Sequence, residues 1–472
     1  MKYDSSTARL VAILRRTIDG MRPGDRLPSS RELMRAHGVS PVTVSRALGQ
    51  LAAEGLVVTR PGAGTFVAHT PATRAETADL SWQTVALGDR VVNDSGMSAM
   101  LTPPADDVIP LSSGYPNSTL RPDRALANAA ARAVRRPDAW AIPPLAGVPE
   151  LRRWFAAEVG GDVTASDVLV VGGGQAALSH VFRALAAPGT AVLVETPTYP
   201  GALACARAAG LRATAVPMDQ DGVRPDLLAE AFAITGARVF YCQPTLHNPT
   251  GAVLTMERRE QVLAIARAAG AFVIEDDYAR YLTAGPAGSV PPPLIALDTH
   301  GTVVHINSLS KILAPSVRVA GVTVRGPAAR RLRASQLVES FFVARPLQET
   351  VVELTGSSVW RRHIAAMSAE IAVRRDALAS ALATHLPAAR IHLVPPGGMH
   401  LWLHLPSQVD EERLVEDARQ NGVLVSPGRF YHPSEPPGPH LRVTHIAATH
   451  VAELTEGVRR LAAALEAQTT RG

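Results

Sequence analysis

The interior of this chain contains a single lysine, and that lysine stands among hydroxyl groups and near an arginine. Of the 47 basic residues, only Lys2 and Lys311 are lysines. Arginine stays protonated at any working pH, whereas a lysine amine can lose its proton and attack a carbonyl to form a Schiff base. Ser308, Ser310 and Arg318 lie close to Lys311 in the sequence and could hold a phosphate group. The segment therefore predicts a site where Lys311 reacts with a phosphate-bearing aldehyde.

Two other segments carry groups that would suit the same ligand. Residues 275–278 (Glu-Asp-Asp-Tyr) end an apolar run, and acids at such a place are costly unless they meet a cation. A protonated pyridine nitrogen would be such a cation. Two of the three acids could instead be solvated, and we expect this of Asp277. Asn248 could hydrogen-bond a phenolic oxygen, although its Asn-Pro-Thr-Gly setting also marks turns that bind nothing.

Three weaker signals stand elsewhere in the chain. The glycine-rich turn at 172–174 precedes a helix, whose free amides attract phosphate, but Ala177 replaces the glycine that a nicotinamide-binding turn would have. Tyr199 follows an apolar run, where its ring could stack on a flat cofactor or simply pack. Arg442 could grip a carboxylate bidentately, or be one of 45 arginines with no special role.

Alternating strand-like and helix-like segments from Val108 onward must position these groups. The alternation predicts a mainly parallel sheet covered by helices, with ligands at the carboxyl ends of the strands, and a smaller α+β lobe after Ser335. We expect strands at 168–171, 191–195, 239–242, 272–275, 303–306, 317–324 and near 400–405, and helices at 175–187, 200–209, 226–235, 256–269, 335–355 and 362–385.

A small helical unit precedes this body. Ser29 and Glu32 have the spacing of a capping box, in which each side chain satisfies a free backbone amide at a helix start. Ser40, followed by a proline, is placed to cap the next helix. Two short helices joined by about three residues form a helix-turn-helix, and a following hairpin forms a wing. The predicted elements are helices at 6–19, 30–37 and from residue 41, and strands at 56–60 and 65–67.

Charge and side-chain type suggest that this small unit binds a polyanion. Residues 1–70 hold ten Lys and Arg against five Asp and Glu, which accounts for the whole net charge of +5. A compact basic segment joined to a neutral body favours a nucleic-acid-binding module, although charge alone also fits a solvated basic surface. The second helix of the motif would expose Thr43, Ser45, Arg46 and Gln50, residue types that touch phosphates and base edges in a major groove.

Length and composition exclude several other classes of protein. A chain of 472 residues implies two or three folded units, and 46% hydrophobic with 19% charged residues excludes disordered, collagen-like and coiled-coil chains. No apolar run approaches a membrane span and no secretory signal is recognisable, so we expect a cytoplasmic protein without a membrane partner. Cys205 and Cys242 form no CxxC pair and support neither a disulfide framework nor a metal site. We interpret residues 71–107 as a linker.

Residues 27–67 resemble the winged-helix domain of the GntR family. They match its pattern of Leu-Pro-Ser-x-Arg, Val-Ser-x-x-Thr-Val and Gly-x-Gly-Thr-x-Val. One departure is Pro41, where the family often carries arginine, so one possible phosphate contact is missing. The resemblance implies that DNA contacts come from Arg31, Ser40, Thr43, Ser45, Arg46, Gly64 and Thr65.

Residues 108–465 resemble fold type I aminotransferases, the aspartate aminotransferase-like enzymes that use pyridoxal 5'-phosphate. The match rests on the order and spacing of the motifs as well as on their content. The resemblance implies that Lys311 is the catalytic Schiff-base lysine and that Asp276 is the partner of the pyridine nitrogen. It also implies that Asn248 and Tyr278 bind the ring hydroxyl, that Tyr199 flanks the ring and that Arg442 binds the ligand carboxylate. The implied phosphate-binding residues are Gly174, Gln175, Ser308, Ser310 and Arg318.

In this order the two resemblances are similar to the MocR (GabR-like) regulators over nearly the whole chain. The implied division is a winged helix-turn-helix at 1–70, the linker at 71–107 and an aminotransferase-like effector domain of fold type I at 108–470, with its smaller α+β lobe. Two departures concern the cofactor. Ile142 stands where that group usually has a tyrosine that reaches the partner subunit's phosphate, and Gly174 stands where a serine is common.

The expected function is that of a homodimeric transcription factor that binds DNA. It would use pyridoxal phosphate on Lys311 to sense an amino compound, or sense the cofactor itself, and pass the change to the winged helices. A working aminotransferase with a DNA-binding extension is the alternative, although catalysis has no use for a winged helix. A third interpretation, supported by Ile142 alone, is a DNA-binding scaffold whose body has lost its cofactor.

Overall fold

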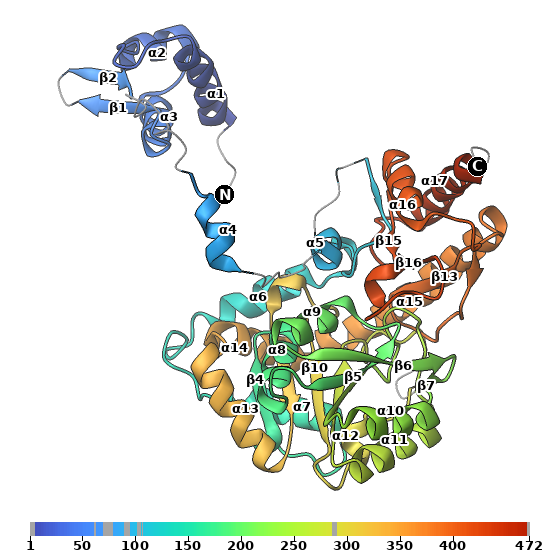
Figure 1. Cartoon of the computed structure of the whole chain (residues 1–472). Helices are drawn as coiled ribbons and strands as arrows, with labels where there is room; N and C mark the ends of the chain where they lie inside the picture. The colour runs from blue at the N-terminus through green and yellow to red at the C-terminus, as the bar shows by residue number, and fades with distance from the viewer. Residues whose placement is uncertain are drawn as a thin grey trace. The chain divides into compact units, whose positions relative to one another are not determined.

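The computed structural model divides into two compact units, Met1–Val91 and Val92–Gly472 (Figure 1). It describes residues 5–60, 63–68, 79–88, 95–101, 105, 107–285 and 290–469. The boundary between the units lies inside the segment interpreted as a linker. Within the described ranges, no helix is long and apolar enough to cross a membrane.

The N-terminal unit is a bundle of three helices followed by a two-stranded hairpin. The predicted capping box is present, because Ser29 Oγ accepts from the Glu32 amide at 3.4 Å and the Glu32 carboxylate accepts from the Ser29 amide at 2.7 Å. Gly38 ends that helix in the left-handed conformation, as predicted. The elements are α1 (Ser5–Asp19), α2 (Ser30–His37), α3 (Pro41–Ala53), β1 (Val57–Arg60) and β2 (Gly64–Val67). Their apolar faces meet in one core, which contains Leu10, Leu14, Leu33, Val44 and Leu51.

Helix α3 presents Ser45, Arg46 and Gln50 to solvent, but it does not present Thr43. Thr43 is only 6% exposed, so the prediction that α3 exposes it is wrong. The cause is local: Ser40 Oγ caps the helix by accepting from the Thr43 amide at 3.2 Å, and the two hydroxyl groups lie 2.9 Å apart. Thr43 therefore belongs to the cap and to the buried side of α3.

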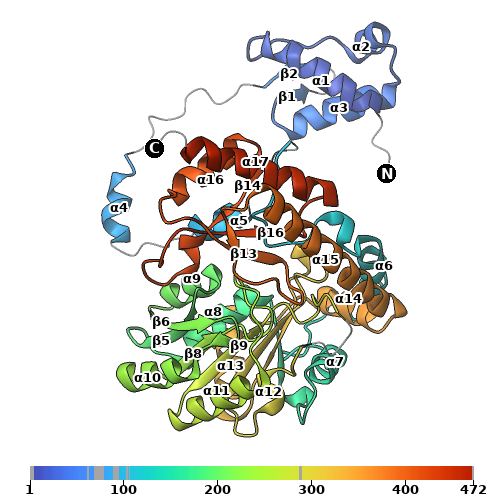
Figure 2. The same ribbon diagram turned by 90° about the vertical axis from the view of Figure 1, so that its right-hand side faces the viewer.

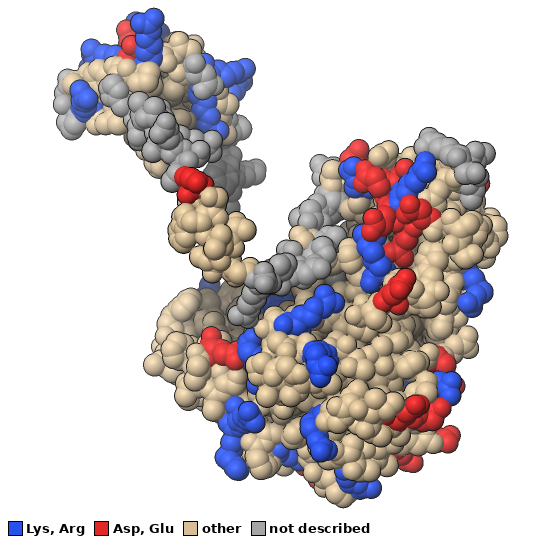
Figure 3. Space-filling view, in the orientation of Figure 1, with Lys and Arg blue, Asp and Glu red and all other residues tan. Residues whose placement is uncertain are grey.

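The remaining predicted DNA contacts differ in their exposure. Arg31 is exposed on α2, whereas Thr65 is buried in the hairpin with its hydroxyl 3.3 Å from that of Thr59. Gly64 has a φ of +117°, and a side chain there would collide with the guanidinium of Arg26. The tip of the wing, Pro61 and Gly62, lies outside the described residues. Blue side chains predominate over red ones on the visible face of this unit (Figure 3).

The segment interpreted as a linker contains two short helices, α4 (Ser81–Leu87) and α5 (Ser95–Leu101). Helix α4 belongs to the N-terminal unit and exposes Trp82 and Val85. Helix α5 belongs to the larger unit, where it packs against helix α9. The segment interpreted as a linker therefore includes helical structure that was not predicted, because short helices with few apolar partners leave little periodicity to detect.

The larger unit is built on an eight-stranded sheet with the order β4-β11-β10-β9-β8-β5-β6-β7. The strands from β10 through β9, β8 and β5 to β6 are parallel, so their carboxyl ends share one edge. Strand β11 is antiparallel to both of its neighbours. The strands are β4 (Val168–Val171), β5 (Ala191–Thr196), β6 (Arg212–Asp219), β7 (Gly222–Val223), β8 (Val239–Cys242), β9 (Phe272–Asp277), β10 (Val303–Ser308) and β11 (Ala320–Thr323).

Helices cover both faces of this sheet (Figure 2). Alternate residues of each strand point to opposite faces, and the two faces form separate apolar cores. One core includes residues of α8, α9 and α13, and the other includes residues of α10, α11 and α12. The helices are α6 (Asp123–Ala133), α7 (Pro149–Val159), α8 (Gly174–Leu185), α9 (Pro200–Ala208), α10 (Pro225–Thr235), α11 (Met256–Ala268), α12 (Leu294–Leu297), α13 (Gly326–Glu339) and α14 (Arg345–Thr355).

A smaller α+β lobe follows, as predicted, and the long helix α15 (Ser358–His385) leads into it. Its four-stranded sheet has the order β12-β13-β16-β15, and a separate parallel pair joins β14 to β3. Its other elements are β3 (Ile109–Pro110), β12 (Arg390–Ile391), β13 (His400–His404), β14 (Val423–Leu424), β15 (Ser426–Pro427), β16 (His440–Thr444), α16 (Glu411–Gln420), α17 (Val451–Thr469) and the short 3₁₀ helix η4 (Gly428–Tyr431).

Two predicted elements have the wrong extent. The helix expected over 335–355 is two helices, because the chain leaves α13 after Glu339 and Phe341 takes a φ of +57°, which an α-helix cannot contain. The strand expected over 317–324 starts only at Ala320, because Pro315–Val317 forms a 3₁₀ turn and Arg318 has a φ of +45°. In both places, a continuous apolar pattern runs across a backbone turn.

Candidate functional site

A cavity of about 630 Å³ lies at the carboxyl edge of the parallel strands, within the larger unit. Every residue that the sequence placed around the cofactor or the ligand carboxylate lines it. These residues come from separate segments of the chain, and the fold brings them to one place. They are Gly174, Gln175, Tyr199, Asn248, Asp276, Tyr278, Ser308, Ser310, Lys311, Arg318 and Arg442.

Lys311 projects into this cavity from the turn after β10. Its Nζ donates to the carbonyl oxygen of Gly114 at 2.7 Å and lies 3.4 Å from the ring centroid of Tyr115. Burial, together with the nearby cations Arg442 and Arg318, lowers the pKa of Lys311 to about 7, although Asp276 opposes the shift. A substantial fraction of the amine is therefore uncharged near neutral pH, which is the form that attacks a carbonyl.

Asp276 is the buried acid that faces the cavity from the end of β9. Its Oδ2 accepts hydrogen bonds from Tyr241 Oη and Gln243 Nε2, both at 2.8 Å. Burial raises the pKa of Asp276 to about 6, although these two hydrogen bonds oppose the shift. A cationic ring nitrogen beside Asp276 would favour the carboxylate form, so the site suits a protonated pyridine.

Gln243 connects two parts of the site that the sequence treated as separate. Its Nε2 donates to Asp276, and its Oε1 accepts from the backbone amide of Asn248 at 3.1 Å. Its own backbone amide donates to the carboxylate of Glu195 at 2.8 Å. Gln243 and Tyr241 were not predicted as site residues. A polar glutamine directly after the buried strand β8 could have indicated that Gln243 faces the site.

The phosphate end of the site is built from small residues and hydroxyl groups. Gly173 has a φ of +89°, and a side chain there would collide with the guanidinium of Arg318. The Cβ of a residue at Gly174 would lie 3.4 Å from Ser308 Cβ, so α8 starts directly beside that serine. The Ser310 hydroxyl is buried and has no hydrogen-bond partner. Helix-start amides, hydroxyl groups and a guanidinium are the groups that hold a phosphate.

The opposite end of the cavity holds Arg442, on the central strand β16 of the small lobe. Its Nη1 donates to Asn248 Oδ1 at 3.3 Å, and its Nη2 donates to the carbonyl oxygen of Ser112. Its Nε is buried without a partner, so the guanidinium keeps bonding capacity for a ligand. His400 Nε2 lies 3.4 Å from Arg442 Nη1, and burial lowers the pKa of His400 well below its usual value. His400 is therefore an uncharged neighbour of this cation.

Three lining residues use their polar atoms within the protein. Tyr199 donates its hydroxyl to Gln175 Oε1 at 3.1 Å, and Gln175 Nε2 donates to the carbonyl oxygen of Gly201 at 3.0 Å. The side chain of Gln175 is thus held by α9, so its backbone amide at the start of α8 is the group available to a phosphate. Tyr278 donates its hydroxyl to the carbonyl oxygen of Leu246 at 2.8 Å.

Asp277 is buried, so the expectation that it is solvated is wrong. It forms ion pairs with Arg280 and with His305, the latter at 3.1 Å. These partners hold the pKa of Asp277 below its ordinary value despite burial. Glu275 is also buried, with its carboxylate accepting from the amides of Leu294 and Ile295. The three consecutive acids therefore have three different sets of partners.

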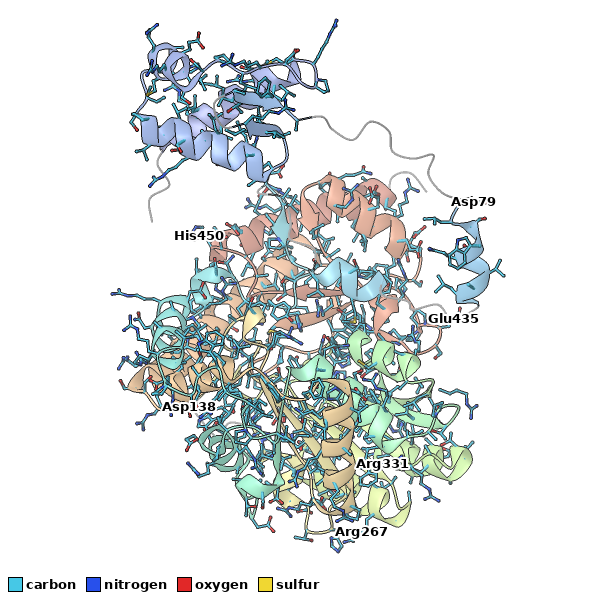
Figure 4. The ribbon with its side chains drawn as sticks, turned by 90° about the vertical axis from the view of Figure 1, so that its left-hand side faces the viewer. Asp79, Asp138, Arg267, Arg331, Glu435 and His450 are labelled. Atoms are coloured by element: carbon cyan, nitrogen blue, oxygen red, sulfur yellow. The ribbon has the colours of Figure 1, made fainter. Side chains whose placement is uncertain are left out.

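These residues fit pyridoxal 5'-phosphate. The cavity offers a buried amine for its aldehyde, a buried carboxylate for its ring nitrogen and an unpartnered hydroxyl at the phosphate end. Ile142 does not line the cavity of this subunit and is 76% exposed. Its loop is fastened to α14 by an ion pair between Asp138, labelled in Figure 4, and Arg345.

Two family models match the chain. The model described as aminotransferase class I and II matches residues 106–461. The model described as bacterial regulatory proteins, gntR family, matches residues 6–67. The two matches flank the segment that contains α4 and α5.

Full-length relatives and a solved structure agree with this division. The chain is 28% identical to the uncharacterized HTH-type transcriptional regulator YdfD of Bacillus subtilis, over 93% of this chain and 91% of that one. It is 27% identical to the HTH-type transcriptional regulator TauR of Rhodobacter capsulatus, over 94% and 93%. The crystal structure of LysN, an alpha-aminoadipate aminotransferase from Thermus thermophilus with bound N-(5'-phosphopyridoxyl)-L-leucine, aligns with a TM-score of 0.75, at 27% identity over 81% of this chain and 97% of that one.

The pKa of Lys311 predicts how the protein acquires its cofactor. Because the uncharged amine is the nucleophile and its pKa is about 7, the attachment rate of pyridoxal phosphate should rise about tenfold per pH unit below that value and level off above it. Stopped-flow absorbance between pH 5 and 10 would measure this profile. Arg442→Gln should move the midpoint upward, since it removes a cation beside the amine. A rate that keeps rising to pH 10 would contradict the prediction.

The bridging position of Gln243 predicts a loss of cofactor affinity on substitution. Gln243→Leu removes the donor to Asp276 and leaves the Asn248 amide unpaired, so the Kd for pyridoxal phosphate should rise about tenfold, the effect of about 1.4 kcal/mol. Spectrophotometric titration would measure it. Gln261→Leu, on the exposed side of α11, is the matched control and should leave the Kd unchanged. Equal affinities for both variants would show that Gln243 does not support the site.

Proposed function

Because the chain belongs to the aminotransferase class I and II family over residues 106–461 and begins with a gntR-family regulatory domain, we propose that it is a pyridoxal phosphate-dependent transcriptional regulator that senses an amino compound. The observation that carries the proposal is the cavity in which Lys311, Asp276 and Arg442 meet, in the same chain as a winged helix. The winged helix supplies DNA binding, and the cavity supplies the ligand response. DNA as the partner also implies a cytoplasmic location.

The residues predicted to hold the cofactor and a ligand carboxylate have separate parts in this proposal. When bound, pyridoxal phosphate supplies an aldehyde that amines attack and a ring that accepts electrons. Lys311 Nζ would hold the cofactor, the Asp276 carboxylate would keep a proton on the ring nitrogen, and Arg442 would orient a ligand carboxylate. The phenolic oxygen would lie near Asn248 and Tyr278. The phosphate would be held by Arg318, Ser308, Ser310 and the amides that begin α8.

An amino compound acts as a signal only if it changes the body's preference between two states. A ligand amine that takes the place of Lys311 frees the lysine side chain and adds its own carboxylate and side chain to the cavity. These contacts differ between the two states, which is the condition for coupling to DNA binding. The small lobe contributes Arg442 and the large sheet contributes Lys311, so the ligand would contact both.

We also propose that the protein works as a homodimer. Large apolar side chains are exposed on the loop after α6 and beyond the end of α13, including Trp140 at 79%, Ile142 and Phe341. Both segments are tied to α14, since Arg345 pairs with Asp138 and the chain after Phe341 runs directly into that helix. Exposed apolar side chains on two segments that join the same helix suit contact with a second copy of the chain. Sedimentation equilibrium at micromolar concentration should give twice the mass of one chain.

A working aminotransferase is the second candidate, and the state of Lys311 favours it. An amine with a pKa near 7 can both accept and donate a proton, as movement of a substrate proton requires. The winged helix argues against turnover as the main role, because transamination does not use it.

The visible absorption spectrum of the full chain with added pyridoxal phosphate separates these functions. Lys311→Ala should abolish the band of the lysine-bound cofactor. If an amino acid then shifts the wild-type band persistently, without accumulation of pyridoxamine phosphate, the protein is a sensor. If pyridoxamine phosphate accumulates and a keto acid restores the band, it is an aminotransferase. Absence of any Lys311-dependent band would reject both functions.

The exposed position of Arg46 predicts its effect on DNA affinity. Arg46→Ala should weaken operator binding and reduce the slope of log K against log salt by about 1, because each phosphate contact releases counterions. Fluorescence anisotropy at several salt concentrations would measure both effects. Arg331→Ala, on the exposed side of α13 (Figure 4), should change neither. An Arg46 variant with wild-type affinity and slope would remove α3 from the DNA interface.

A further inference from the structure

The cavity has lining residues beyond those assigned to the cofactor and to a ligand carboxylate. Its charged lining consists, among the described residues, of Asp276, Lys311, Arg318 and Arg442. All four have a role in the proposed function, since three serve the cofactor and Arg442 serves the ligand carboxylate. His400 also lines the cavity, but its lowered pKa leaves it uncharged. Apart from Lys311, which the ligand amine would release, no charged side chain of the described lining remains for the rest of an amino compound.

The lining that remains is apolar or uncharged, and one of its residues, Tyr115, lies beside the reactive nitrogen. The ring of Tyr115 faces Lys311 Nζ at 3.4 Å. Met97 and Leu101 of α5 and Met399 add thioether and aliphatic groups to the same cavity. A ligand whose amine takes the position of Lys311 Nζ and whose carboxylate meets Arg442 would bring its side chain to this surface. We call Met97, Leu101, Tyr115 and Met399 the apolar wall.

Helix α5 is held against the larger unit by close contacts. A Cβ at Gly96 would lie 3.0 Å from Phe430 Cγ on η4, so a larger residue there would require the phenylalanine ring to move. Met97 Sδ lies 3.8 Å from Gln175 Nε2, at the start of α8. Leu101 lines the cavity yet remains 58% exposed, so it has apolar surface left to be covered. The helix therefore contributes a fixed thioether and a partly open leucine to the wall.

From this distribution of charge, and resting on the proposed function, we infer that the effector is an α-amino acid with an uncharged, apolar side chain. Met97 and Leu101 of α5 contact that side chain and determine specificity. A second carboxylate or an ammonium group at this position would lose its water without gaining a partner, which disfavours acidic and basic amino acids. An aliphatic or aromatic side chain would instead cover the exposed surface of Leu101.

The inference also assigns a second task to α5. The helix lies between the winged helix and the sheet in the chain, within the segment 68–107 that connects the two units. A ligand side chain that covers Leu101 would stabilise α5 in its packed position against the larger unit, whereas a charged ligand side chain would not. Helix α5 would thus distinguish one effector from another at the start of the larger unit.

The test is a titration of the full chain, loaded with pyridoxal phosphate, with L-leucine, L-phenylalanine, L-glutamate and L-lysine. The concentration that half-shifts the absorption band should be about 100-fold lower for leucine or phenylalanine than for glutamate or lysine, since an unpaired charge must enter the cavity. Equal or lower half-shift concentrations for glutamate or lysine would overturn the inference. A cation contributed by a partner subunit would produce that result for glutamate.

Variants at Met97 supply the second measurement. Met97→Arg should lower the half-shift concentration for glutamate at least about tenfold and raise that for leucine, because it adds the missing cation to the wall. Met256→Arg, at the exposed start of α11, is the matched control and should change neither. An unchanged preference in Met97→Arg, with the absorption band intact, would overturn the role of α5.

The same titrations distinguish a failure of the proposed function from a failure of the proposed effector class. If no Lys311-dependent band forms, or no amine shifts it, the proposed function fails and the inference fails with it. If the band forms and shifts, but acidic or basic amino acids shift it best, only the inference fails.

Discussion

An acid, an amine and two guanidinium groups line one cavity, where burial works against their charged forms. The rest of the body positions these groups side by side. Burial disfavours the charged form of each group, which raises the pKa of Asp276 and lowers that of Lys311. The guanidinium groups of Arg442 and Arg318 push the lysine further toward its neutral form. A ligand with a cationic ring nitrogen would stabilise the Asp276 carboxylate, and a phosphate on the same ligand would pair with the Arg318 guanidinium. The parallel sheet brings these groups together, because the carboxyl ends of its strands place residues from distant segments at one edge.

The fold and most of the site could be predicted from the sequence because their signals are local. Lys311 stands out against 45 arginines, and the capping box at Ser29 specifies a helix start without help from tertiary structure. The errors arise where specific side-chain contacts, local or tertiary, override the usual behaviour of a residue type. Thr43 is of a type common at surfaces, but a cap holds it inward, and Asp277 resembles a solvated acid until the fold brings His305 beside it. Gln243 was missed because its importance lies in a bond between two strand ends.

Helix α5 shows why a segment interpreted as a linker can still contribute to the lining of a cavity. Its sequence has little periodicity, yet Gly96 and Met97 both make close contacts with the body. Such contacts come from the shape of the partner surface rather than from an amphipathic pattern, so no hydrophobic repeat reveals them.

Charged side chains of both signs are interspersed over the visible face of the larger unit (Figure 3), whereas basic groups concentrate in the N-terminal unit. The two units therefore present different electrostatic surfaces to the solvent.

The scarcity of lysine has a consequence for chemical selectivity in the cell. Aldehydes, including free pyridoxal phosphate, condense with exposed amines on most protein surfaces, and such adducts compete with a specific site. Guanidinium groups do not form these adducts under working conditions, because they remain protonated. With arginine in place of lysine at nearly every basic position, Lys2 is the one other lysine in the chain that could trap the aldehyde. Few side-chain amines outside the cavity can therefore condense with an aldehyde such as pyridoxal phosphate, and Lys311 is the lysine that the fold places inside the cavity.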